Sequence, residues 1–233
     1  MMPATGFLIV VLLPVILVVG LATAALAWIS YTLWRKAVRG AIVDAVSLSR
    51  GASNVGICEI VADSGLYDYD ALFAQSQRLV IALNDGRTWL SVHRDRLRRR
   101  VQDTSKETTI FLIDPNSEMV GVLARKGSTT KNAIQARIAE SVQLLSELVV
   151  PGAQLEVLGH SLFNPHAAVV GDNRALLTPY FASRGGRTVP VFCFEDSGPQ
   201  SFFRQLRDDL EALRTDAREL RLQLGEPAKL HTV

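Results

Sequence analysis

The hydrophobic pattern begins with one long uncharged run, Phe7 to Trp34, that holds no Asp, Glu, Lys or Arg. About 20 apolar residues in helical form span the hydrocarbon core of a bilayer. Arg35 and Lys36 follow the run at once, and no basic residue precedes it. By the positive-inside rule, the pattern predicts a single-pass anchor in the inner cell membrane, with the N-terminus outside and the following domain in the cytoplasm.

A cleaved signal peptide is the alternative for this run, with Ala25-Leu26-Ala27 as its cleavage site. The run is about twice as long as a normal h-region and lacks a basic n-region, so the anchor is favoured. After the anchor (1–34), apolar positions at helical spacing predict a juxtamembrane helix over 35–49, and Arg50 to Asn54 reads as a linker. We therefore divide the chain into 1–34, 35–55, a domain over 56–224 and a tail over 225–233.

The domain alternates short apolar stretches with amphipathic ones, which predicts strands and helices in turn. Its second half places several strands in succession, and Gly171-Asp172-Asn173 makes a hairpin turn between two of them. The expected fold is α/β, a mixed sheet flanked by helices. The predicted strands cover 57–61, 78–83, 108–113, 154–158, 167–170, 175–178 and 189–194, and the predicted helices cover 68–77, 88–101, 131–149 and 201–224.

Composition narrows the function classes. The chain has 233 residues and a formal net charge of +2. Such a balanced charge argues against a dedicated nucleic-acid binder. The two cysteines, Cys58 and Cys193, lie in apolar strand-like sequence, where reduced core thiols are expected in a cytoplasmic domain. No CxxC pair or His/Cys cluster indicates zinc, and we expect no cofactor.

Polar residues gather where predicted strands end, and ligands of open α/β sheets bind beyond the carboxyl ends of the strands. The first such loop also opens a helix, where free backbone amides favour an anion such as phosphate. The alternatives to ligand binding are that these residues cap helices, form turns or, for the histidines, have a structural role. The candidate ligand-binding residues are Asn84, Asp85, Arg87, Thr88, Asp114, Asn116, Ser117, His160, Asn164, His166 and Arg174.

The segments LIDPNSEMVGVLARK and LEVLGHSLFNPHAAVVGDNRALLTPYF, with a long helix between them, resemble the phospholipase D-like family over roughly residues 56–220. In that family a strand carries the motif H-x-K-x4-D. His166 matches the histidine nucleophile, whereas Ala168 occupies the lysine position and Asn173 the aspartate position, with Asp172 one residue early. The downstream G-S-x-N-type element is replaced by 177–180, Leu-Thr-Pro-Tyr.

The missing lysine bears on catalysis. A histidine nucleophile in phosphodiester hydrolysis needs cations to stabilise the charge on the transferring phosphoryl group. Removing one such stabiliser costs about 10²–10³-fold in rate. His166 is thus the one catalytic candidate that the resemblance implies, and a non-catalytic, ligand-binding member of the family is favoured over an active one.

Two further patterns concern partners. Five arginines lie within Arg94–Arg100, for which a solvated helix face is the bland interpretation and contact with anionic lipid or nucleic acid the alternative. Apolar residues from Phe203 to Leu224 keep a 3-4 spacing, which suits either packing on the sheet or a self-association seam. The family resemblance, in which two motif copies meet across a dimer, favours a homodimer.

These observations support one favoured hypothesis and two alternatives. The favoured one is a membrane-anchored sensor or effector that binds a phosphorylated, nucleotide-like ligand or a protein partner, in bacterial signalling or anti-phage defence. The first alternative is a phosphodiesterase that acts on phospholipid or nucleic acid through His166. The second is a membrane-tethered scaffold.

Overall fold

The computed structural model describes residues 23, 26–36, 38, 51–181 and 188–220, which belong to two units, 1–51 and 52–233. In the first unit, residue 23 and residues 26–36 are helical. None of the helices in the described residues has both the length and the apolar character needed to cross a membrane. Most of the predicted anchor, Phe7–Trp34, and most of the predicted juxtamembrane helix lie outside the described residues, as does the tail over 225–233.

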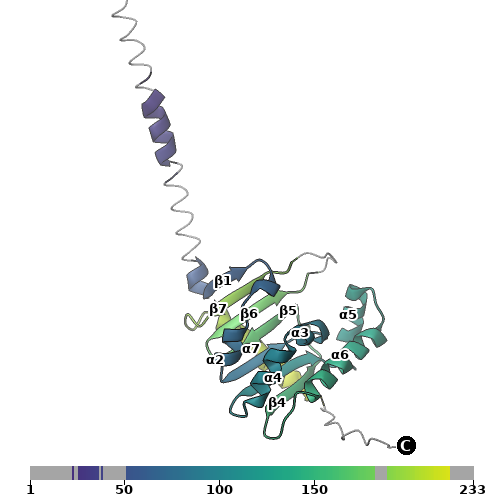
Figure 1. The fold of residues 1–233 in the computed structure, drawn as a ribbon. Helices are drawn as coiled ribbons and strands as arrows, with labels where there is room; N and C mark the ends of the chain where they lie inside the picture. Colours follow the sequence, from purple (N-terminus) through teal and green to yellow (C-terminus); the bar gives the residue numbers. More distant parts are fainter. Residues whose placement is uncertain (1–22, 24–25, 37, 39–50, 182–187, 221–233) are drawn as a thin grey trace, which may run out of the picture. The chain divides into compact units, whose positions relative to one another are not determined.

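The second unit is an α/β domain built on an eight-stranded mixed sheet in the order β1-β7-β6-β5-β2-β3-β4-β8 (Figure 1). Its elements are β1 (Ile57–Val61), η1 (Ser64–Leu66), α2 (Asp70–Gln75), β2 (Arg78–Ala82), α3 (Arg87–Val92), α4 (Arg94–Gln102), β3 (Glu107–Ile113), α5 (Met119–Gly127), α6 (Lys131–Ser146), β4 (Gln154–His160), β5 (His166–Val170), β6 (Arg174–Pro179), β7 (Val191–Glu195), α7 (Phe202–Asp216) and β8 (Arg218–Glu219).

The three strands β2, β3 and β4 are parallel neighbours, and the remaining pairs are antiparallel. Parallel strands are buried on both faces and read as near-continuous apolar runs, as β2 and β3 do. Alternate side chains of the strands enter two separate cores. One core lies under α2 to α6 and the other under α7, so helices cover both faces of the sheet (Figure 1). The predicted mixed sheet flanked by helices is confirmed.

The C-terminal helix is shorter than predicted. It ends at Asp216, and the next residues form β8, which pairs with β4. The apolar stripe of α7 lies on the sheet, with Phe203, Leu206 and Leu210 at most 6% exposed. Packing on the sheet is therefore the correct interpretation of this stripe, and the seam over 203–216 is not available for self-association.

Three local predictions were wrong. Residues 51–55, expected in a linker, are helical. Helix α5 was missed, because its short apolar pattern follows the turn Asp114-Pro115-Asn116-Ser117 without a clear cap. The helix predicted over 88–101 is two helices, α3 and α4, that meet at His93.

His93 stands where the two helices meet, and its ring is held in an aromatic cluster. Its ring centroid lies 4.2 Å from that of Trp89 and 4.4 Å from that of Tyr69, and Phe73 stacks at 6.0 Å. Only 5% of the residue is exposed. Burial lowers the pKa of His93 to about 4, and the nearby Arg96 guanidinium adds to this effect.

This pKa predicts acid lability. In the unfolded chain, His93 has a pKa of about 6.5 and is protonated below that pH. In the folded protein, it is protonated only below about pH 4. The stability contributed by neutral His93 is therefore complete above about pH 6.5 and is lost as the pH falls toward 4. Between pH 7 and pH 4.5, wild type should lose about 2 kcal/mol more unfolding free energy than His93→Phe, measured by urea unfolding. Equal losses in both proteins would contradict the assignment.

Candidate functional site

Most of the predicted site residues lie along one edge of the sheet, the edge at which the parallel strands end. The carboxyl ends of the parallel strands β2, β3 and β4 lie at this edge. Strand β5 runs antiparallel to β2, so it begins at the same edge, and β6 ends there beside it. The loops that carry Asn84, Asp114 and Asn164 therefore lie at the same edge as His166. The sequence predicted that these three loops would lie together.

A pocket of about 440 Å³ lies at the end of β2, on the face covered by α3, α5 and α6. This volume falls within the range of small-molecule sites. Its walls come from the β2–α3 loop, from α5 and α6, and from the end of β6. The lining residues are Leu83, Asn84, Asp85, Gly86, Thr88, Trp89, Leu123, Lys126, Gly127, Ile134, Arg137, Tyr180 and Phe181.

The floor of the pocket is formed by the β2–α3 loop. Gly86 has a φ of +74° and sits against the core, where a Cβ would lie 2.8 Å from Leu112 and 3.1 Å from Leu90. Only glycine therefore fits this turn. The Asp85 carboxylate accepts from the Arg87 amide at 3.2 Å, and the Ser141 hydroxyl donates to the Asp85 carbonyl at 2.7 Å. The loop is thus fixed before any ligand arrives.

Two cationic side chains line the pocket. The Arg137 guanidinium lies 3.7 Å from the Asp85 carboxylate, and its side chain is 39% exposed. The Lys126 ammonium donates to the Tyr180 carbonyl at 3.2 Å and lies 5.4 Å from the centre of the Tyr180 ring. Burial raises the pKa of the Tyr180 phenol, so its hydroxyl stays neutral at physiological pH. The backbone N–H of Asn84 donates to that hydroxyl at 3.4 Å.

Arg137, Lys126, Trp89 and Tyr180 were not among the predicted site residues. Arg137 lies in the long helix α6, where a lone arginine among polar positions carries no signal in the sequence. Lys126 lies in the helix that the sequence analysis missed. Tyr180 was noted only as part of a replaced motif. Their common feature is tertiary: four separate segments, α3, α5, α6 and the end of β6, bring them to the same strand end.

The remaining residues of the first loop behave differently. Thr88 lines the pocket. Arg87 lies outside the pocket lining and forms an ion pair with Glu140 at 2.7 Å, with both side chains more than half exposed. Neither Asp85 nor Thr88 is the N-cap of α3, which is Gly86 without a side-chain capping bond; the Asp85 carboxylate accepts from the Arg87 backbone amide in the turn before the helix.

The second loop is held by its own turn and by the C-terminal segment. The Asp114 carboxylate accepts from the Asn116 amide at 2.8 Å, and the Ser117 amide donates to the Asp114 carbonyl. Arg218 of β8 forms a two-nitrogen ion pair with Asp114, with both contacts at 2.6 Å. Asp114 is thus already paired, and turn chemistry accounts for its position.

The histidines of the third loop do not meet. His160 is fully buried, and neither ring nitrogen makes a hydrogen bond of good geometry. Burial lowers its pKa, against the opposing effects of Asp216 and the Leu162 backbone. Because β4 and β5 are separated by β2 and β3, His160 and His166 are about 14 Å apart at a strand spacing of about 4.8 Å. Asn164 is 6% exposed and accepts from the His166 amide at 3.4 Å.

His166 begins β5 on the side of the sheet that α7 covers. Burial lowers its pKa, and Asp209 of α7 opposes this effect. Ala168, at the position where the resembled motif has lysine, is 1% exposed within the apolar core under α7, a core that also holds Phe111 and Phe203. His166 therefore has an apolar neighbour where the motif would supply a cation, and it does not line the pocket.

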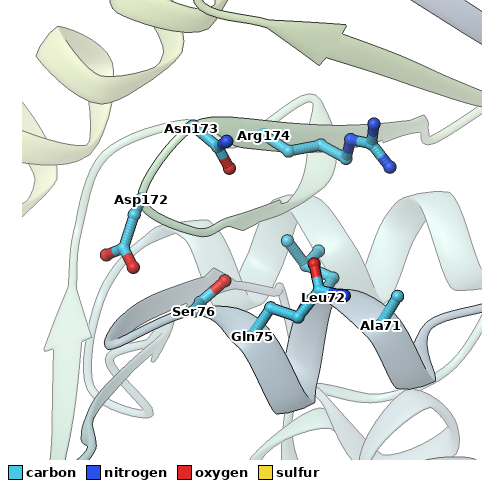
Figure 2. Close-up of a pocket in the computed structure, with 7 residues that line it drawn as sticks. All are labelled: Ala71, Leu72, Gln75, Ser76, Asp172, Asn173 and Arg174. Carbon is cyan, nitrogen blue, oxygen red and sulfur yellow. The ribbon is translucent and has the colours of Figure 1, made fainter.

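The β5–β6 hairpin lies at the opposite edge of the sheet. Figure 2 shows Asp172, Asn173 and Arg174 on this turn, over α2. The Asp172 carboxylate accepts from the backbone amides of Gln77 and Arg78 at 2.6 and 3.0 Å, so it anchors the start of β2. Arg174 forms an ion pair with Glu195. The structure thus separates Arg174 from the other predicted ligand-binding residues.

Metal binding finds no support in the described part of the chain, where no group of three or more His, Cys, Asp or Glu side chains is arranged to hold an ion. No family model and no curated protein matches the chain. Several solved structures resemble it distantly. One is TrmBL2, an archaeal chromatin protein whose structure shows a novel mode of DNA binding, with 13% identity over 79% of this chain and a TM-score of 0.43.

Another is the phosphatidylserine synthase of Haemophilus influenzae Rd KW20, with 18% identity over 72% of this chain and a TM-score of 0.41. The chain spans 64% of the length of the first protein and 40% of the second, less than two thirds of either.

Proposed function

We propose that this chain is a membrane-anchored binding protein whose α/β domain recognises a phosphorylated, nucleotide-like small molecule without hydrolysing it. The observation that carries the proposal is the pocket at the end of β2. It combines two cations, Arg137 and Lys126, with a fixed backbone loop and with the aromatic side chains of Trp89, Tyr180 and Phe181. Cations suit phosphate groups, and aromatic rings offer stacking surfaces for a base.

The geometry around Arg137 supports this choice of ligand. Asp85 lies close enough to orient the guanidinium but too far for a tight hydrogen-bonded pair, at 3.7 Å. A guanidinium in that position keeps donors for a phosphate, which it binds through two parallel N–H groups. The Gly86 turn places the backbone of the β2–α3 loop beside the same space.

The environment of His166 argues against hydrolysis. A phosphodiesterase of the resembled type needs a cation beside the nucleophile, and the lysine position is a buried alanine inside an apolar core. The His166 side chain also lies on the face of the sheet opposite the pocket. Membership of the phospholipase D-like family remains a prediction that depends on the sequence motif alone.

The membrane part of the proposal depends on the uncharged run Phe7–Trp34 and the basic residues that follow it. One chain contributes a single crossing. A binding event in the domain would therefore reach the membrane through association of several copies, in a signalling or defence role. Since α7 buries its apolar stripe, such a homo-oligomer would use a different surface.

Replacing Arg137 tests the binding site. The full chain in a mild detergent would be titrated calorimetrically with a panel of linear and cyclic nucleotides, as wild type and as Arg137→Gln. The variant should bind the preferred nucleotide about 10- to 100-fold more weakly, the value of one charge-assisted hydrogen-bond pair.

Arg98→Gln is the matched control, because Arg98 lies in α4 outside the pocket and forms only an exposed pair with Asp95. It should bind like wild type. If wild type bound none of the nucleotides, the proposed ligand class would be refuted. If both variants lost affinity equally, the assignment of the binding site to this pocket would be refuted.

A further inference from the structure

The two cysteines, 135 positions apart in sequence, meet in the fold. The sulfur atoms of Cys58 in β1 and Cys193 in β7 lie 3.0 Å apart, both as free thiols. This separation is about 1 Å longer than a disulfide bond. The sequence analysis treated them as unrelated core residues, because nothing local links β1 to β7.

A β-bulge creates this contact. Ile57 pairs with Phe194 and Glu59 pairs with Cys193, so Cys58 is the additional residue of β1 with no partner of its own. A bulge redirects side chains locally, and here it turns the Cys58 sulfur toward Cys193. Neighbouring antiparallel strands also have Cα separations within the range that disulfides bridge.

The two thiols differ in access. Cys58 is exposed to solvent, whereas Cys193 is 1% exposed. Burial raises the pKa of Cys193 to about 12, and its sulfur lies 3.8 Å from the Tyr67 hydroxyl. The positive charge of Arg174 opposes this rise. Cys58 is therefore the thiol that an oxidant reaches, and Cys193 is the neighbour that can resolve it.

We propose that Cys58 and Cys193 form a reversible redox pair that responds to a peroxide. The Cys58 sulfur attacks one peroxide oxygen, the O–O bond breaks, and Cys58 sulfenic acid and water form. The Cys193 sulfur then attacks the Cys58 sulfur, the S–O bond breaks, and its oxygen leaves with the Cys193 proton as a second water. Both thiols are oxidised, hydrogen peroxide is reduced, and a dithiol reverses the reaction by exchange.

The bond would act on the first strand of the domain. β1 is an edge strand whose one neighbour in the described sheet is β7, and it directly follows the helical residues 51–55. A Cys58–Cys193 disulfide joins β1 to β7 covalently. Strand β1 can then no longer separate from the sheet unless β7 separates with it. Oxidation would thereby hold β1 against β7.

The test uses the full chain, reduced and held in a mild detergent, and treated with hydrogen peroxide. Thiol titration should show both thiols lost and then recovered with dithiothreitol. Peptide mapping should find Cys58 joined to Cys193 in a monomer lighter by two hydrogen atoms. Hydrogen exchange at the amides of β1 should slow at least tenfold in the oxidised protein.

Two variants keep the test decisive. In Cys193→Ala, Cys58 should stop at sulfenic acid, captured by dimedone, and β1 exchange should not change on oxidation. Cys58→Ser alters an exposed site and should leave the Cys193 thiol resistant to peroxide. The proposal fails if wild type instead forms intermolecular Cys58 dimers, or if Cys58 proceeds to sulfinic acid while Cys193 stays a thiol.

Discussion

Replacing Arg100 with methionine is expected to lower the unfolding free energy by about 3–5 kcal/mol, although the residue lies in what the sequence shows as a run of surface arginines. Arg100 is 3% exposed. Its guanidinium donates to four backbone carbonyls and to the Thr108 hydroxyl, at 2.7 to 3.0 Å. The carbonyls belong to Phe73, Ser76, Gln77 and Glu107.

The large effect follows from what the substitution leaves behind. Methionine fills much of the space but donates nothing, so carbonyls at the end of α2 and the start of β3 lose their donors. Each buried group left without a partner costs about 1–3 kcal/mol. Burial lowers the pKa of Arg100 only to about 10, so the residue is still charged at pH 7.

Arg98→Met is the control for this prediction. Arg98 lies two positions away in the same helix, and its side chain is 45% exposed with a single pair to Asp95 at 3.5 Å. Its loss should change stability by less than about 0.5 kcal/mol. Urea unfolding of the full chain in a non-ionic detergent, followed by circular dichroism, measures both. Equal effects would mean that Arg100 is not a buried anchor.

Restoring the lysine of the resembled motif is expected to damage the protein rather than activate it. Ala168→Lys would place an ammonium in the core that Ala82, Phe111 and Phe203 form under α7. Burial in such surroundings lowers the pKa of a lysine by about 3–5 units, which at pH 7 corresponds to about 4–5 kcal/mol of lost stability. The same substitution should create no phosphodiesterase activity.

The matched control is Ala139→Lys on the exposed face of α6, which should leave stability within about 0.5 kcal/mol of wild type. Unfolding curves and hydrolysis of bis(p-nitrophenyl) phosphate would be compared for both proteins. A stable Ala168→Lys variant that hydrolyses this substrate through His166 would overturn the proposal of a non-catalytic site. Loss of that activity in the His166→Ala background would identify the nucleophile.

Both predictions concern residues whose surroundings the sequence does not reveal. The arginine run was interpreted as a solvated helix face, and this is correct for Arg98 and wrong for Arg100. The departure from the H-x-K-x4-D motif was visible in the sequence, yet its consequence depends on α7. That helix covers the lysine position with apolar side chains.

The sequence by itself determined the type and order of most elements, because the spacing of apolar residues reports which face of a local segment is buried. It missed α5, β8 and the break at His93. The sequence also placed polar loops at the ends of β2, β3 and β4, since parallel strands must end at one edge. It located His166 at the same edge, although on the face away from the pocket.

Only the tertiary structure decided what each buried face meets. An unexpected helix such as α5 changes the partners of a neighbouring segment without changing that segment's own periodicity. Thus α7 packs on the sheet, Arg174 is carried to the far edge by the reversal between β5 and β6, and Arg137 reaches the pocket from α6. The pairing of Cys58 with Cys193 is the clearest case, because it depends on a single bulge between strands far apart in the chain.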